Sequence, residues 1–109
     1  MPEDYIKKIK STRNMKYIAD SAAKGALSKW LETDGIRMRV LSYPPNFKAD
    51  HICYKGHAIY IVAGTIKIKI ENEIWTWKRD DALIIPENLA HEVINDNEKE
   101  AKVIVMDNK

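Results

Sequence analysis

Residues 66–85 read IKIKIENEIWTWKRDDALII, and this stretch decides the fold class. Ile66, Ile68 and Ile70 alternate with charged residues, which is the period of a β-strand with one face toward a core and the other toward water. The polar triplet at 71–73 then ends the run, and two further apolar runs follow with a second polar turn between them. Short runs separated by turn residues predict consecutive antiparallel strands.

The same pattern extends outward in both directions. Residues 36–40 (IRMRV) alternate apolar with charged side chains after a turn signal at 33–35, and Val93 and residues 103–106 supply later strands. Seven or eight short strands within about 80 residues are typical of an all-β barrel or sandwich. No stretch repeats with the period of a solenoid.

The composition fits one small domain. The chain has 109 residues, of which 45% are hydrophobic, and this is enough to fill a single core. Eighteen basic and sixteen acidic side chains give a net charge of +2, too near balance for the basic stripe that nucleic acid or anionic lipid requires. We therefore expect neither nucleic acid nor a membrane as a partner.

Residues 1–26 differ from the rest, since they carry six Lys or Arg against three acids. Apolar residues lie there at loosely helical spacing: Tyr5, Ile6, Ile9 and Ile18. We interpret this part as a basic arm, either a short helix or an extended packing segment, before a β domain at 27–109. A docking segment for an acidic partner and a solvated terminus both fit the composition.

The chain has a single thiol, Cys53, so no intramolecular disulfide can form. A free or metal-bound cysteine is typical of a reducing compartment. No apolar run reaches the length of a signal sequence or a membrane span. We therefore expect a cytoplasmic protein.

All three histidines fall in or beside strand-like segments. On a strand, residues two apart share a face, so His51 and Cys53 are predicted to point the same way. The triplet Tyr54-Lys55-Gly56 suits a tight turn, with Gly56 able to take a positive φ, so that His57 opens the neighbouring strand. His91 lies 34 residues after His57, and the strand period alone does not bring it to this cluster.

Residues 45–95 resemble the two cupin motifs, G-x5-H-x-H-x3-E-x6-G and G-x5-P-x-G-x2-H-x3-N, with matching spacing throughout. In the first motif His51 stands at the first histidine, while Cys53 replaces the second and His57 replaces the glutamate. Gly64 closes that motif, and Pro45 takes the place of its opening glycine.

In the second motif Pro86, His91 and Asn95 match outright. Asp80 and Asn88 occupy its two glycine positions, and these are the substitutes best able to adopt a left-handed backbone. The turns of the second motif are therefore expected to survive both replacements.

Residues 50–57 (DHICYKGH) are also similar to the small single-domain cupins called DHCW-motif proteins. The resemblance implies an all-β double-stranded β-helix, or jelly-roll, barrel. It also implies one metal site, with four candidate ligands: His51, Cys53, His57 and His91.

Three imidazoles and a thiolate favour zinc, then Ni, Fe or Cu, over Mg, Ca or Mn. If all four residues bind zinc, no position remains for water or substrate, and the site is a closed structural or sensing one. If Cys53 stays out, three histidines leave a position open for catalysis on a small molecule. A cupin that has lost its metal is the third alternative, with its histidines hydrogen-bonded to one another.

Two further features complete the expectations. Trp75 and Trp77 share a strand face, where packing in the core or at a subunit interface is favoured over lining a ligand pocket. The small size of the barrel, the arm and the tendency of single-domain cupins to pair predict a homodimer. No residue is assigned as a general acid or base.

Overall fold

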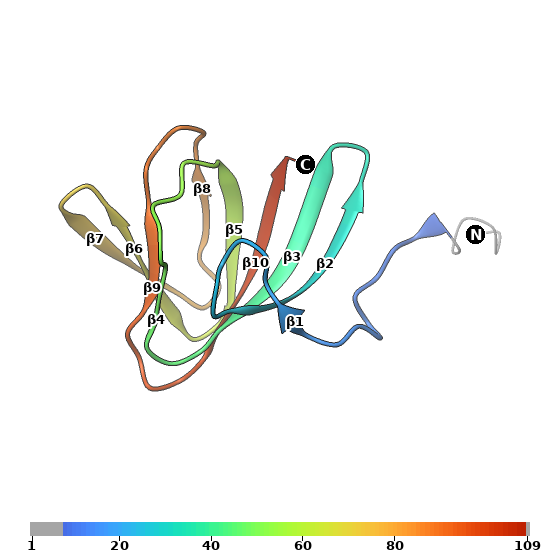
Figure 1. Cartoon of the computed structure of the whole chain (residues 1–109), viewed down its shortest axis with the longest axis horizontal. Coiled ribbons are helices and arrows are strands. Elements are labelled where there is room, and N and C mark those ends of the chain that lie inside the picture. Colours follow the sequence, from blue (N-terminus) through green and yellow to red (C-terminus); the bar gives the residue numbers. More distant parts are fainter. Residues whose placement is uncertain (1–7, 109) are drawn as a thin grey trace.

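Two antiparallel β-sheets make up the fold in the computed structural model, which describes residues 8–108 (Figure 1). One sheet has six strands in the order β1-β2-β3-β10-β5-β8, and the other has four in the order β4-β9-β6-β7. The strand bounds are β1 Ile18–Ala19, β2 Leu27–Thr33, β3 Ile36–Tyr43, β4 Phe47–Lys48, β5 His57–Ala63, β6 Thr65–Ile70, β7 Glu73–Lys78, β8 Ala82–Ile85, β9 Glu92–Asn95 and β10 Ala101–Asn108.

The all-β prediction is confirmed for the described residues. The stretches predicted as strands at 36–40, 66–70 and 82–85 are β3, β6 and β8. The two sheets face each other in the manner of a jelly roll but do not close into one hydrogen-bonded barrel, since each keeps its own edge strands.

The core lies between the sheets and follows the strand period. Along β10 the residues Ala101, Val103 and Val105 are buried and their neighbours are less so. Ile66 and Ile68 of β6 are each 1% exposed and face them from the other sheet. Burying such side chains stabilises the fold by about 1.5–3 kcal/mol each. Ile70 is half-buried and packs against the same core, so the inward face predicted for β6 is confirmed.

The two indoles of β7 have different surroundings. Trp77 packs against the core, as predicted, whereas Trp75 is 56% exposed.

The turns of the second motif behave as expected. Asp80 and Asn88 both have positive φ, at 74° and 68°. These two residues therefore do what glycine does at the same positions, which confirms the prediction that the turns survive.

The segment around Gly56 is not the tight hairpin turn that the sequence predicted. Residues 54–56 carry the chain from the edge of the four-stranded sheet to β5 in the six-stranded sheet. Gly56 has no positive φ, and its lack of a side chain matters for another reason. A Cβ atom there would lie 2.9 Å from the backbone nitrogen of Glu87, so only glycine lets these two segments approach.

Asn95 ties together the loops at one end of the fold. It is fully buried, and its Nδ2 donates to the carbonyls of Tyr43, Pro44 and Lys99 at 3.3, 3.0 and 2.9 Å. The last residue of the second motif therefore has a structural role.

The basic arm is extended in the part that the structure describes. Lys8, the first described residue, is helical, whereas residues 9–26 contain no helix and their regular element is β1, which pairs with β2. A helical arm is therefore not shown over residues 9–26, while Tyr5 and Ile6 lie outside the described residues. No helix in the described part of the chain has the length and apolar character needed to cross a membrane.

Candidate metal centre

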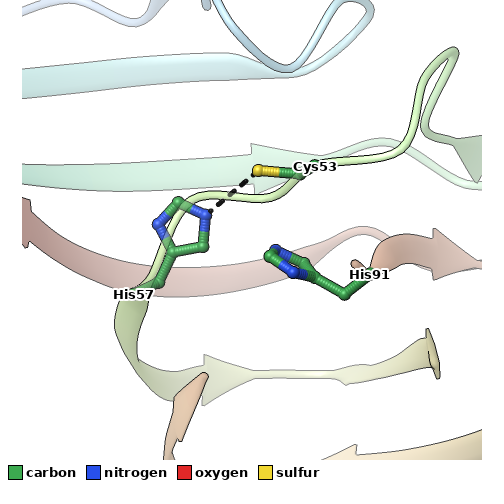
Figure 2. Close-up of side chains that lie close together, drawn as sticks. All are labelled: Cys53, His57 and His91. Carbon is green, nitrogen blue, oxygen red and sulfur yellow. Dashed lines mark hydrogen bonds between the residues drawn. The ribbon is translucent and has the colours of Figure 1, made fainter. Parts of the chain in front are cut away.

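Three side chains of metal-ligand type come together between the two sheets (Figure 2). Cys53, His57 and His91 offer one donor atom each, and these atoms all lie within 4.8 Å of one another. Cys53 and His91 stand opposite each other in an isolated antiparallel bridge with two backbone hydrogen bonds of 2.9 Å, so their side chains share a face. His57 is the first residue of β5 and approaches from the other sheet.

The hydrogen bonds of the two imidazoles define which nitrogen of each ring carries the proton. His91 Nδ1 lies 2.8 Å from the carbonyl oxygen of Leu89, which can only accept, so Nδ1 carries the proton. His57 Nδ1 lies 3.1 Å from Asp107 Oδ2 and donates to this carboxylate. Both Nε2 atoms therefore keep a lone pair for a metal ion or another donor.

The three side chains also contact one another directly. Cys53 Sγ lies 3.5 Å from His57 Nε2, so the thiol donates to the lone pair of the ring. The rings of His57 and His91 meet edge to face, with centroids 5.3 Å apart.

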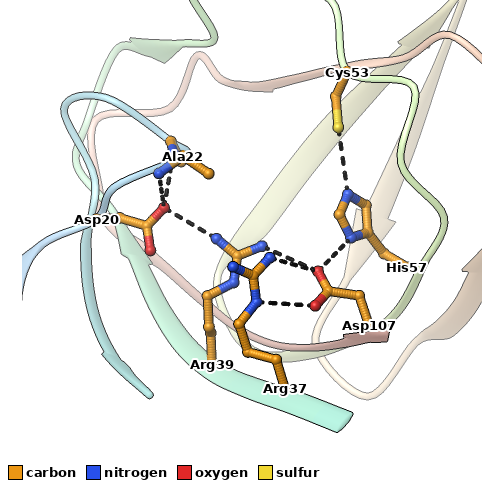
Figure 3. Close-up of polar contacts among 8 residues, drawn as sticks. Asp20, Ala22, Arg37, Arg39, Cys53, His57 and Asp107 are labelled. Carbon is orange, nitrogen blue, oxygen red and sulfur yellow. Dashed lines mark hydrogen bonds and ion pairs between the residues drawn. The ribbon is translucent and has the colours of Figure 1, made fainter. Parts of the chain in front are cut away.

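Asp107 anchors His57 and is itself held by two arginines (Figure 3). Arg37 donates two hydrogen bonds to the Asp107 carboxylate in a bidentate pair, at 3.0 and 3.1 Å. Arg39 Nη2 lies 3.6 Å from Asp107 Oδ2. Burial favours the neutral acid, but the hydrogen bonds and charge of Arg37, with the charge of Arg39, lower the pKa of Asp107 below its usual value. Asp107 therefore stays a carboxylate.

Burial also acts on His57. It lowers the pKa of this imidazole, and the nearby charge of Asp107 opposes that effect only in part. His57 is consequently held neutral, which is the form that binds a metal ion.

His51 does not join the cluster in this structure. Its Nδ1 lies 2.7 Å from Asp50 Oδ1, and its side chain is 58% exposed at the rim of the cavity. The predicted sharing of a strand face with Cys53 fails because residues 51–52 form no strand and pairing begins only at the Cys53 bridge. The four-ligand set itself stays a prediction.

A cavity of about 120 Å³ opens beside the donor cluster. Apolar side chains form much of its wall, among them Leu41, Phe47 and Val93, and Tyr43 lies with them. Burial raises the pKa of Tyr43 strongly, so its hydroxyl stays protonated. The cavity is suited to a small ligand next to the cluster.

Sequence reasoning missed the groups that support the cluster. Arg37 and Arg39 alternate with apolar residues in β3, and such charges normally face water. Here the charged face points inward, with Arg39 only 6% exposed, while Ile36 on the other face is 48% exposed. The signal available in the sequence was Asp107, an acid ending the apolar run of β10.

The sequence of residues 47–107, more than half of the chain, matches the cupin domain family, and the chain belongs to that family. No curated protein sequence matches it significantly.

Solved structures share the fold at low sequence identity. The polyketide cyclase RemF from Streptomyces resistomycificus matches with a TM-score of 0.77 at 16% identity, over 93% of this chain and 78% of the cyclase. A Cupin 2 conserved barrel domain protein from Salinispora arenicola gives 0.74 at 10%, over 91% and 86%. The cupin domain of an XRE family transcriptional regulator from Enterobacter cloacae gives 0.64 at 14%, over 76% and 95%.

Proposed function

We propose that this cupin binds one divalent transition metal through Cys53, His57 and His91 and presents it to a small molecule in the adjoining cavity. The observation that carries the proposal is the convergence of one sulfur and two nitrogen donors within 4.8 Å. In a tetrahedral zinc site with Zn–S and Zn–N bonds of ordinary length, S and N ligand atoms lie about 3.5 Å apart. Cys53 Sγ and His57 Nε2 already have this separation, 3.5 Å.

The protonation of the two imidazoles also suits a metal ion. Both rings present Nε2 with a lone pair, and Asp107 behind His57 and the Leu89 carbonyl behind His91 are the outer partners that fix metal-ligating imidazoles. A thiolate with imidazoles favours zinc first, then Ni, Fe or Cu.

The fourth position decides between enzyme and closed site. His51 is the predicted fourth ligand, and its binding requires the rim segment at 50–52 to move inward. With His51 outside, one position stays open toward the cavity, where a bound metal ion would polarise a ligand or activate water. The polyketide cyclase neighbour supports catalysis on such a barrel, but at this identity the likeness concerns the fold alone.

A metal-free cupin is the second candidate, and one contact favours it. The Cys53 thiol and His57 Nε2 satisfy each other by a hydrogen bond, so two of the three donor atoms have a partner without an ion. The regulator neighbour is consistent with a sensing role for such a domain.

Elemental analysis tests the proposal. The protein is purified without a polyhistidine tag, dialysed, and its metal content is compared with those of two variants, His91→Ala in the cluster and His51→Ala at the rim. We expect about one metal ion per wild-type chain and a sharp loss in His91→Ala. Equal occupancy in the wild type and His91→Ala would refute the assignment. Retained metal in His51→Ala would identify the site as three-ligand and open.

We also propose that the chain forms a homodimer through the outer face of the six-stranded sheet. The aligned residues Met38, Met106, Ala58 and Ile84 cross four neighbouring strands of that sheet. Met106 is 39% and Ile84 80% exposed, while Met38 and Ala58 are half-buried, so part of this apolar row is uncovered within the described chain.

A further inference from the structure

Three cationic side chains line the cavity beside the donor cluster. Its wall includes Arg37, Arg39 and Lys55, and the acid among its lining residues is Asp50, which contacts His51 at the rim. Asp20 and Asp107 pair with the two arginines and offset much of their charge, but they are not among the residues that line the cavity.

Arg39 keeps hydrogen-bonding capacity that the fold does not use. Its side chain is 7% exposed, and Nη1 donates to Asp20 Oδ2 at 3.0 Å (Figure 3). Its Nη2 approaches Asp107 only to 3.6 Å, and its buried Nε has no hydrogen-bond partner. Because Arg39 lines the cavity and its Nη2 lies beyond hydrogen-bond distance of Asp107, Nη2 is the donor that a ligand in the cavity would take.

The guanidinium is also held in place. Asp20 Oδ2 accepts from the backbone of Ala22 and Ala23 at 3.0 and 2.7 Å as well as from Arg39. This carboxylate therefore fixes one edge of the guanidinium and leaves other donors available.

We infer that Arg39 binds the carboxylate of a small organic acid whose apolar part lies against Leu41, Phe47 and Val93. The planar guanidinium matches a carboxylate in geometry and charge. The apolar wall calls for a hydrocarbon portion, which an inorganic anion lacks. A cavity of about 120 Å³ is close to the roughly 150 Å³ that accommodates benzene, so the ligand has about six non-hydrogen atoms.

This inference names the class of ligand that would bind in the cavity beside the proposed metal site, and to that extent it rests on the proposed function. It depends, however, on Arg39 and not on the metal. The two can therefore be tested separately on the same preparations.

The test compares isobutyrate with isobutyramide, which have the same size and differ in charge. Binding is measured by calorimetry on zinc-loaded and on chelator-treated protein, with propionate and propionamide as a second pair. We expect each acid to bind at least about tenfold more tightly than its amide, since one charge-assisted hydrogen bond is worth that much. Inorganic phosphate is expected to bind more weakly than the acids.

Variants assign the effect to Arg39. Arg39→Gln is expected to weaken isobutyrate binding at least about tenfold, while Arg79→Gln, an exposed arginine, leaves it unchanged. Because Arg39→Gln leaves Asp20 unpaired, the double variant Asp20→Asn/Arg39→Gln removes both charges and is checked for folding by circular dichroism. The comparison of acid and amide in the wild type needs no variant.

The outcomes separate the two proposals. Stoichiometric zinc with acid and amide bound equally, or with neither acid bound, overturns the carboxylate inference and leaves the metal site standing. Binding of the acids that depends on Arg39 in protein that takes up no zinc supports the inference and refutes the metal. Phosphate bound more tightly than both acids would overturn the organic acid assignment.

Discussion

His57 Nδ1 lies 3.1 Å from Asp107 Oδ2, although the two residues are 50 positions apart in the chain. The pairing of β5 with β10 brings them together, since Ala58 stands opposite Met106. The contact turns the lone pair of His57 Nε2 toward Cys53, and Arg37 holds the carboxylate from the other side. The geometry of one candidate ligand therefore depends on a residue at the end of the last strand.

Replacing Asp107 with Asn keeps the shape of the side chain and removes its charge. We expect zinc affinity, measured by competition with a chromogenic chelator, to fall about 10–100-fold, which is the usual effect of losing an outer carboxylate. Asp96→Asn is the matched control, since this exposed acid pairs with Lys67 at the surface, away from the cluster. Unchanged affinity in Asp107→Asn would show that the carboxylate does not orient His57.

The stability of the metal-free protein should depend on pH through His57. Its pKa is lowered in the folded state, so between that value and the ordinary value of about 6.5 the unfolded chain binds more protons. The contribution of neutral His57 to the free energy of unfolding is therefore fully present above about pH 6.5 and decreases as the pH drops below it. Urea titrations should show a smaller fall in His57→Gln; identical slopes would contradict the assignment.

Asp107 should cause a second decrease in the free energy of unfolding at lower pH. Because its pKa is also lowered, its contribution to stability is present above about pH 3.9 and is lost as the pH falls through its folded-state pKa.

Cobalt substitution tests whether Cys53 is a ligand. A coordinating thiolate should give a charge-transfer absorption band in the cobalt protein, and this band should be absent in Cys53→Ser. Zinc binding should also weaken in that variant and fall at acid pH, since protons compete for sulfur and imidazole. Cobalt bound without the band would make Cys53 a bystander and leave an open position.

Alanine substitutions at two glycines distinguish the cost of a strained backbone from the cost of a steric clash. Gly35 and Gly64 have similar positive φ, 82° and 78°, but a Cβ at Gly35 meets nothing within 4 Å whereas one at Gly64 lies 2.8 Å from the Glu100 carbonyl oxygen. Gly35→Ala should therefore cost about 1–2 kcal/mol of unfolding free energy. Gly64→Ala should cost about 1–3 kcal/mol more. Equal losses in thermal or urea unfolding would show that the loop at 100–101 gives way.

The proposed dimer can be broken from its outer face. Ile84→Lys places a charge in the apolar row and should convert the dimer to a monomer in light scattering at micromolar concentration. Ile74→Lys, at a 55% exposed position in the other sheet, should not. A monomeric wild type would refute the dimer.

The strands were predictable because alternation and turn residues are local signals. The motif spacing likewise identified Cys53, His57 and His91, which the fold brings together. The support from Asp107 was not predictable, because only the pairing of β5 with β10 places it. The inward arginines of β3 reversed the usual pattern, since buried acids compensate their charge, and this compensation cannot be recognised in the sequence of β3 alone.

The donor cluster joins two sheets that share no strand pairing. Cys53 and His91 belong to the side of β9, while His57 begins β5 in the opposite sheet. An ion held by all three would act as a crosslink closing the 34-residue span from His57 to His91. Its removal would let the two sheets move apart at this end of the fold. Backbone amides at the start of β5 would then exchange faster in the metal-free protein than in the metal-bound protein.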